Sequence, residues 1–337
     1  MTGADASPTG GAVRVRSNAK VNLALRVRGK RDDGFHELET VLLGLELAGE
    51  VTVSRADGAA PGSLFVATSG PCATADIVDG PEHLALRGAA AAREALGADD
   101  ALHVAVTKGV PSRAGLGGGS ADAAAAAWAT LELLGGPTLG GEAVLARAAD
   151  ALAAVGSDCA FFFEARGRSA ALATGRGERV RPFAGSPPWS ISVLTPDVEC
   201  ATPAVYGALG REAGSVAAPA WDLDRAEALL ALGVDAARAE LMNDLEEAAL
   251  RAEPRLGAWL DLVDEAGHGH LTLAGSGSSL FGLHSNHDEA TAAVEAILAA
   301  GRERGLGFRF ACVTRAEASL LDRLATGGAP TGTESAR

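Results

Sequence analysis

A glycine-rich stretch between a strand-like and a helix-like segment constrains this chain more than any other feature. Leu102, Val104 and Val106 alternate with other residues, which predicts a strand. Gly109–Gly119 follows, and an alanine-rich helix is expected to begin near Ser120, whose hydroxyl would cap it. Glycines let a ligand approach the backbone closely, and a helix N-terminus attracts anions. The order of strand, glycine loop and helix therefore predicts a phosphate-binding site.

The loop differs from two common nucleotide-binding motifs. A Walker A motif requires a lysine at the helix start, where this chain has none, and a GxGxxG fingerprint would have glycine in place of Ser120. The alternative interpretation is a tight turn without a ligand, because glycine loops are common. Asp122 is interpreted as a complement to the helix dipole rather than a metal ligand.

Composition narrows the classes of partner. The 337 residues favour two domains, and 29 Lys and Arg against 43 Asp and Glu give a net charge of −14. A negative surface repels nucleic-acid phosphates and anionic lipids, so we expect neither nucleic acid nor membrane as a partner. The sequence has no recognisable signal peptide, no apolar run of membrane-spanning length and no closely spaced cysteines. These features predict a cytoplasmic protein.

The mixed order of predicted elements indicates an α+β protein. Residues 1–12 and 326–337 are predicted as flexible tails. A break rich in glycine and proline near 186–189 divides the rest into two predicted domains, 13–185 and 186–325. Further strands are predicted at 13–27, 50–54, 63–66, 191–194, 271–274, from 280 and at 308–313, and helices at 83–96, 224–232, 236–251, 255–266 and 288–300.

Three segments together resemble the GHMP kinase superfamily. They read AKVNLALRV at 19–27, PSRAGLGGGSAD at 111–122 and LAGSGSSLFGL at 273–283. A fourth, RDDGFHELET at 31–40, is similar to the branch that phosphorylates a cytidine-diphosphate-linked methylerythritol. The resemblance covers most of residues 13–315. It implies an N-terminal domain like domain 2 of ribosomal protein S5, a C-terminal ferredoxin-like α/β sandwich, and an active site in the cleft between them.

The branch transfers the γ-phosphoryl group of ATP, with Mg²⁺, to the 2-hydroxyl of its acceptor in the non-mevalonate isoprenoid route. The resemblance implies that Lys20 and Asp158 are the catalytic pair. It places ATP at Lys108, Pro111, Gly115, Leu116, Gly117, Gly118, Gly119 and Ser120. It places the acceptor at Asn22, Phe35, His36, Tyr206, Gly275, Ser276 and Gly277.

Each implied role has a chemical reason. Phe35 and Tyr206 match the pair that sandwiches the cytosine, and His36 matches the residue that reads its edge. A carboxylate near the acceptor hydroxyl can take its proton, and a lysine beside it offsets charge on the transferring group. No metal ligand is identified from the sequence, and a monomer or weak homodimer is expected.

Some positions depart from the pattern of the family. Ala121 replaces a second hydroxyl after the loop, so coordination of phosphate or metal would rest on Ser120. Cys159-Ala160 replaces Val-Pro and so removes a fixed φ; the cysteine is interpreted as a packed apolar residue. His83-Leu84 replaces Asn-Leu near the adenine, and whether this histidine contacts the base stays open. Phe35 replaces a tyrosine.

Three other functions are considered. A homoserine or mevalonate kinase would lack the 31–40 segment, and a dinucleotide oxidoreductase would have glycine in place of Ser120. A catalytically silent nucleotide-binding regulator would not need both Lys20 and Asp158. The acidic run 244–247 is interpreted as a solvated helix face, and four histidines are interpreted as loop residues rather than metal ligands: His268, His270, His284 and His287.

Overall fold

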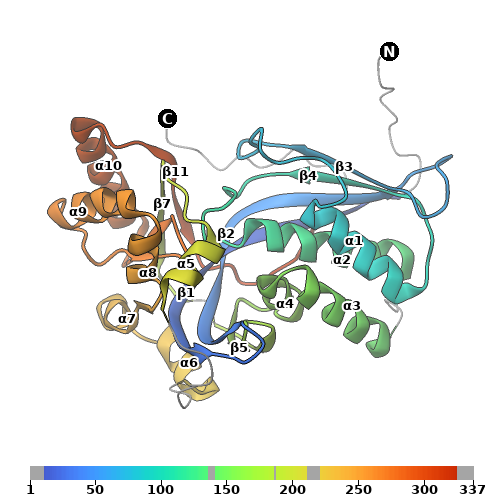
Figure 1. Ribbon diagram of the computed structural model, residues 1–337, viewed down its shortest axis with the longest axis horizontal. Helices are drawn as coiled ribbons and strands as arrows, with labels where there is room; N and C mark the ends of the chain where they lie inside the picture. Colours follow the sequence, from blue (N-terminus) through green and yellow to red (C-terminus); the bar gives the residue numbers. More distant parts are fainter. Residues whose placement is uncertain (1–10, 136–140, 186, 211–220, 325–337) are drawn as a thin grey trace.

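Two β-sheets carry the fold. The computed structural model describes residues 11–135, 141–185, 187–210 and 221–324, and it places helices against both sheets (Figure 1). Within these described ranges the first sheet has eight strands: β1 (Val13–Lys30), β2 (His36–Arg55), β3 (Leu64–Ser69), β4 (Leu102–Thr107), β5 (Ala170–Gly175), β6 (Arg179–Phe183), β8 (Met242–Asn243) and β12 (Arg323–Leu324). Its main path runs β12-β1-β2-β4-β3, and β5 joins β2 to β6.

The long β1–β2 hairpin is the centre of this sheet. Its antiparallel register runs from Val13 opposite Val53 to Lys30 opposite His36. The ends of β1 alternate between buried and half-buried residues, whereas 17–25 is buried throughout. That middle stretch contributes to a core shared with the second sheet, so both faces of β1 are covered there.

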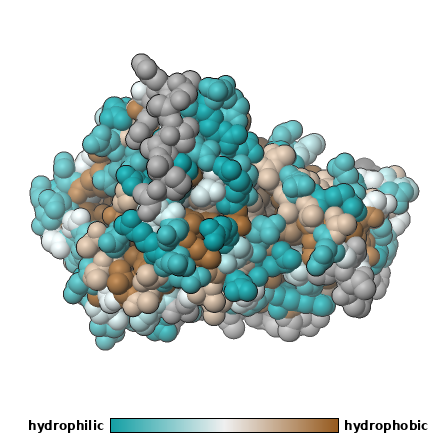
Figure 2. Space-filling model, turned by 90° about the horizontal axis from the view of Figure 1, so that it is seen from below, coloured by the Kyte–Doolittle hydropathy of each residue, from teal (hydrophilic) through white to brown (hydrophobic). Residues whose placement is uncertain are grey.

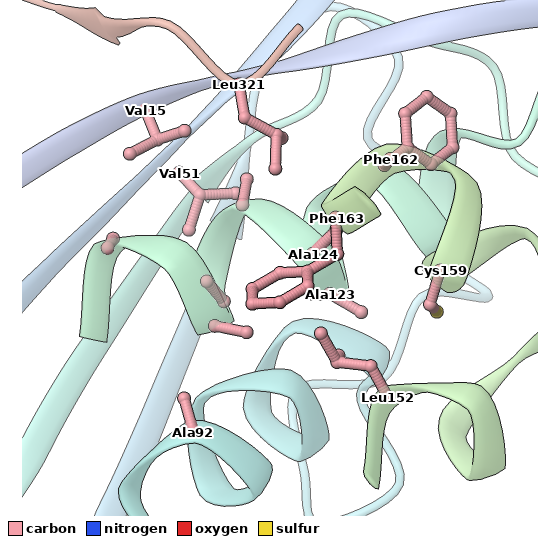
Figure 3. Packing of buried hydrophobic residues seen from close by; sticks show 14 of the residues in the cluster. Val15, Val51, Ala92, Ala123, Ala124, Leu152, Cys159, Phe162, Phe163 and Leu321 are labelled. Atoms are coloured by element: carbon pink, nitrogen blue, oxygen red, sulfur yellow. The ribbon is translucent and has the colours of Figure 1, made fainter. Parts of the chain in front are cut away.

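Four helices cover one face of the first sheet: α1 (Leu84–Leu96), α2 (Gly118–Gly135), α3 (Glu142–Val155) and α4 (Ser157–Glu164). The alanines of α2 are buried, and a Cβ on Gly88 of α1 would lie 2.1 Å from the carbonyl oxygen of Ala123. Small residues therefore allow these two helices to approach closely. Figure 3 shows Phe163 and Leu152 beside the α2 alanines, in the same hydrophobic core.

The second sheet is antiparallel, in the order β11-β7-β10-β9. Its strands are β7 (Ser190–Pro196), β9 (Thr272–Leu273), β10 (Leu280–His284) and β11 (Phe308–Arg315). The helices of this half are α5 (Thr202–Ala208), α6 (Leu223–Leu230), α7 (Val234–Glu240), α8 (Glu246–Ala252), α9 (Gly257–Glu265) and α10 (His287–Arg304), with a 3₁₀ turn at Pro254–Leu256. The α+β class predicted from the sequence is confirmed.

The helix predicted at 236–251 is wrong, because the chain breaks between α7 and α8. Met242 and Asn243 form β8, which pairs in parallel with β1 and extends the first sheet. The interpretation of 244–247 as a solvated face also needs correction: only Glu247 is exposed, and the Asp244 carboxylate accepts a hydrogen bond from the backbone N–H of Val27 at 2.9 Å.

His268 and His270 lie in the turn region between α9 and β9, as expected, whereas His284 and His287 differ from the expectation of loop residues. His284 lies in β10, is 1% exposed, and its Nε2 is 2.8 Å from the hydroxyl of Ser192 on the neighbouring strand. Burial lowers the pKa of His284 to about 4. This side chain is therefore a neutral core residue at physiological pH, while His287 begins α10.

Hydrophilic residues cover most of the face seen in Figure 2, with smaller apolar areas between them. Throughout the described ranges, the longest helices are too polar or too short to cross a lipid bilayer.

Candidate active site

A cleft of about 1470 Å³ lies where the two halves of the molecule meet. Its lining combines the middle of β1, the glycine loop before α2, the start of α4, α5 of the second half and the turn at 275–277. Every residue that the sequence analysis placed at a site lines this cleft except Leu116. Leu116 is fully buried, and its carbonyl oxygen accepts the backbone N–H of Lys20 at 3.0 Å.

Lys20 is fixed at the floor of the cleft. The residue is 3% exposed, and its ammonium donates to Asn22 Oδ1 at 2.9 Å and to the Gly115 carbonyl oxygen at 2.8 Å. The amide of Asn22 is itself held by the Thr40 hydroxyl at 2.9 Å. These contacts hold the ammonium charge at one point beside the glycine loop.

Asp158 meets Lys20 from a distant part of the chain. It lies in the first turn of α4, and its Oδ2 is 3.3 Å from the Lys20 Nζ. The side chain of Asp158 is 36% exposed, whereas that of Lys20 is 4% exposed. The carboxylate is therefore open to a ligand on one side and oriented by the buried ammonium on the other.

The glycine loop is built by backbone contacts. Gly115 and Gly117 have positive φ of 77° and 73°. A Cβ on Gly115 would lie only 1.9 Å from the carbonyl oxygen of Ala274, so the loop and the second half touch backbone to backbone. Helix α2 begins at Gly118, which places Ser120 inside its first turn; the predicted cap at Ser120 is therefore wrong by about two residues.

A buried ion pair lies below the loop. Lys108 Nζ is 2.5 Å from Asp122 Oδ2, and both side chains are 4% exposed. Asp122 was expected only to complement the dipole of α2, but it neutralises Lys108 at the base of the cleft. Breaking such a pair leaves a buried charge without compensation.

The two aromatic residues of the predicted sandwich each have another partner in the cleft. Phe35 is 50% exposed, and the guanidinium of Arg176 lies 4.7 Å from its ring centre. Tyr206 instead lies against His36, with ring centres 5.2 Å apart and planes inclined by 34°. Burial, together with the nearby charge of Asp158, raises the pKa of Tyr206. All four residues line the cleft.

The turn at 275–277 is held from two sides. Asn243 donates to the carbonyl oxygens of Leu273 and Gly275, each at 2.8 Å. The Ser276 hydroxyl is 2.8 Å from that of Thr202 in α5. The β8 segment that breaks the predicted helix therefore also positions this turn.

The departures from the family pattern have structural explanations. His83 caps α1: its Nδ1 accepts the backbone N–H of Ala85 at 3.2 Å, and its Nε2 is 3.2 Å from the Thr68 hydroxyl. Burial lowers the pKa of His83. Burial also raises the pKa of the Cys159 thiol to about 12, so this cysteine is a packed thiol rather than a nucleophile.

The lining residues that sequence reasoning missed include Arg113, Arg176 and Thr202. Arg113 Nη1 lies 3.6 Å from Asp76 and 3.5 Å from Glu199, so it links the glycine loop to both a preceding loop and the second half. Arg113 lies inside the glycine stretch, and Arg176 lies between two glycines. A cationic residue within a glycine-rich segment was therefore the sequence signal that could have identified both.

Known proteins match this arrangement in sequence. The N-terminal domain of GHMP kinases matches residues 83–165, and their C-terminal domain matches residues 226–303. A 4-diphosphocytidyl-2-C-methyl-D-erythritol kinase of Streptomyces avermitilis is 38% identical over 296 residues, covering 86% of this chain and 94% of the relative.

Solved structures of known proteins also match this chain. A 4-(cytidine 5'-diphospho)-2C-methyl-D-erythritol kinase matches with a TM-score of 0.64 and 31% identity, covering 90% of this chain and 100% of the other. A homoserine kinase from Cytophaga hutchinsonii matches with a TM-score of 0.67 and 16% identity, and the match covers 96% of this chain and 100% of the other. At this identity the match supports only the fold. The fold, the glycine loop and both domain matches define a GHMP kinase. Within that class, the chain belongs to the family of 4-diphosphocytidyl-2-C-methyl-D-erythritol kinases.

Proposed function

We propose that this chain transfers the γ-phosphoryl group of ATP to the 2-hydroxyl of 4-diphosphocytidyl-2-C-methyl-D-erythritol. The observation that carries the proposal is the meeting of Lys20 and Asp158, 3.3 Å apart, beside the glycine loop in a cleft of about 1470 Å³. Phosphoryl transfer depends mainly on positioning and on stabilising charge, and this geometry supplies both.

Asp158 accepts the proton of the acceptor hydroxyl. Its carboxylate is open to the cleft, so a hydroxyl can reach it while Lys20 keeps it oriented. The acceptor oxygen then bonds to the γ-phosphorus, the bond from that phosphorus to the bridging oxygen breaks, and ADP leaves. General-base assistance of this kind contributes roughly 10²–10⁴ in rate.

Lys20 and the glycine loop stabilise the transferred group. The ammonium lies 2.8 Å from the Gly115 carbonyl oxygen, so its charge is adjacent to the loop that would hold the phosphates. The N-terminus of α2, which begins at Gly118, points its dipole toward the same place. Pro111, Gly117, Gly119 and Lys108 complete this proposed donor side.

A magnesium ion fits the donor side. Magnesium prefers phosphate oxygens and water with few protein ligands, and Ser120, in the first turn of α2, lines the cleft. When bound, the ion would neutralise charge on the phosphates. Asp122 is less suited to hold it, since Lys108 occupies this carboxylate.

The acceptor is proposed to lie between the two halves, with its cytosine near Phe35, His36 and Tyr206. Asn22 and the turn 275–277 would contact its polar tail. The division into domains 13–185 and 186–325, the cytoplasmic location and the monomer or weak homodimer stay predictions.

The test is ADP release by purified protein with MgATP and this acceptor, compared with homoserine and mevalonate. We expect turnover with the cytidine-linked acceptor and none with the other two. Turnover with homoserine or mevalonate alone would overturn the proposed acceptor, and absence of ADP release with all three would overturn the kinase activity.

A further inference from the structure

A group of arginines lies beside the acceptor end of the cleft. This arginine cluster consists of Arg28 on β1, Arg31 just after it, Arg176 in the β5–β6 connection and Arg179, the first residue of β6. Segments 26–37 and 176–181 carry seven basic and four acidic residues, in a chain whose net charge is −14. This part of the molecule is therefore positive where the whole is negative.

Three guanidinium groups of the cluster surround one carboxylate. Glu37 Oε1 is 2.6 Å from Arg179 and 4.0 Å from Arg28, and its Oε2 is 3.4 Å from Arg31. Asp33 lies 2.8 Å from Arg31 and offsets a second charge. The side chain of Glu37 is 11% exposed while that of Arg179 is 61% exposed. The carboxylate thus anchors the arginines from below and leaves positive charge facing solvent.

Arg176 extends this charge into the cleft. Its guanidinium lies over the Phe35 ring at 4.7 Å, and its backbone N–H donates to the Glu178 carboxylate at 2.5 Å. The contact with Phe35 and the hydrogen bond to Glu178 fix both ends of this residue. Across the described residues, the Arg176 guanidinium makes no ion pair with a carboxylate.

Most other cationic side chains of the cleft are paired with a carboxylate. Lys20 lies 3.3 Å from Asp158, Lys108 lies 2.5 Å from Asp122, and Arg113 is shared by two carboxylates. Within the described part of the lining, only Arg176 and Lys30 lack a carboxylate within 4.0 Å. Both lie at the end that carries Phe35.

We infer that the arginine cluster recognises the diphosphate of a nucleoside-diphosphate-linked acceptor, an inference that rests on the proposed function. Arg176 binds the phosphates from its position over Phe35, because a guanidinium pairs with phosphate oxygens through two parallel hydrogen bonds. Arg179 lies at the rim, where it draws the anion toward a protein that is otherwise negative. Specificity for a diphosphate-linked acceptor over a small uncharged one follows from this charge.

The first test compares CDP with cytidine as probes, by calorimetric titration of the full chain at low salt. In Arg176→Gln we expect the Kd for CDP to rise about tenfold and the Kd for cytidine to change less than twofold, because only CDP loses charge-assisted hydrogen bonds. Arg176→Lys keeps the charge and should retain part of the preference for CDP. An equal loss for both probes would show that Arg176 only supports the Phe35 ring, and would overturn the inference.

The second test addresses the rim. Arg179→Glu should raise the Kd for CDP roughly threefold at low salt, and the difference should vanish near 0.5 M salt, because screening removes long-range attraction. Arg304→Glu is the matched control, since Arg304 also pairs with a glutamate, Glu265, but lies in α10 away from the cleft. An equal effect of both reversals would overturn the role of Arg179.

The outcomes separate this inference from the function on which it rests. Wild-type protein that binds neither CDP nor cytidine would overturn the proposed acceptor and the inference together. Wild-type protein that binds CDP, with an unchanged Kd in Arg176→Gln, would overturn the inference alone. Melting temperatures of all variants show whether any change in Kd reflects unfolding.

Discussion

The proposed donor and acceptor sides of the cleft are built in different ways. On the donor side, Gly115 and Gly117 adopt positive φ, and the loop touches the second half through backbone atoms. On the acceptor side, Phe35, His36 and Tyr206 present side chains from a hairpin turn and a short helix. A site made of backbone atoms requires glycine wherever a Cβ would collide with another part of the chain. A site made of side chains depends instead on how aromatic rings and charged groups from different elements pack against each other.

The two sides meet at Asp158, so Asp158→Asn is expected to have the largest effect. The amide cannot accept the hydroxyl proton, and we expect kcat to fall roughly 10²–10⁴-fold with little change in ATP affinity. Steady-state kinetics and nucleotide titration measure the two quantities. Asp150→Asn, on the exposed part of α3, should leave both unchanged. Full activity in Asp158→Asn would assign the proton to another group.

The buried pair tests whether the donor side is also a structural unit. Asp122→Ala leaves the Lys108 ammonium buried without a partner, and we expect the free energy of unfolding to fall by about 3–5 kcal/mol. Chemical denaturation measures this loss. The double variant Lys108→Met with Asp122→Ala removes the charge as well and should recover part of the stability. An undiminished stability in the single variant would contradict the buried ion pair.

Gly115→Ala separates backbone from side-chain recognition. The added Cβ would lie 1.9 Å from the Ala274 carbonyl oxygen at a positive φ, so we expect a loss of about 1–3 kcal/mol in stability and at least tenfold weaker ATP binding. Gly80→Ala is the control, because a Cβ there meets no atom within 4 Å. If Gly115→Ala binds ATP normally, the loop is not the phosphate site.

Phe35→Ala addresses the acceptor side alone. Base stacking on an aromatic ring contributes about 1–3 kcal/mol, so we expect the KM for the acceptor to rise about tenfold while the KM for ATP stays constant. Initial-rate kinetics with each substrate varied in turn measure both. Phe35→Tyr keeps the ring and should restore the acceptor KM. A parallel rise in both KM values would indicate a general distortion of the cleft.

The sequence predicted the donor side better than the acceptor side. The strand, the run of glycines and the helix are each indicated by a local pattern in the sequence. The observed β4, glycine loop and α2 agree closely with those patterns. Two features depended on contacts between distant segments: the β8 break at Met242, which pairs with β1, and the partnership of Lys108 with Asp122. No local pattern reports such pairings.

The acceptor side shows the same limit more strongly. Phe35 and Tyr206 are predicted to face a common base, and each has a further partner that the sequence did not indicate: Arg176 lies over Phe35, and His36 lies against Tyr206. These partners come from separate elements, so their contacts follow from tertiary packing and not from spacing in the sequence. The pairing of Lys20 with Asp158 was reached only through resemblance to a family.

The central claim is that one ammonium and one carboxylate, brought together across the floor of the cleft, direct a phosphoryl group to a single hydroxyl. Phosphorus NMR of the product formed from ATP and 4-diphosphocytidyl-2-C-methyl-D-erythritol tests it most directly. The account predicts a new phosphomonoester on the 2-hydroxyl carbon, formed roughly 10²–10⁴-fold more slowly when Asp158→Asn is used. A product phosphorylated elsewhere, or an unchanged initial rate in that variant, would contradict it.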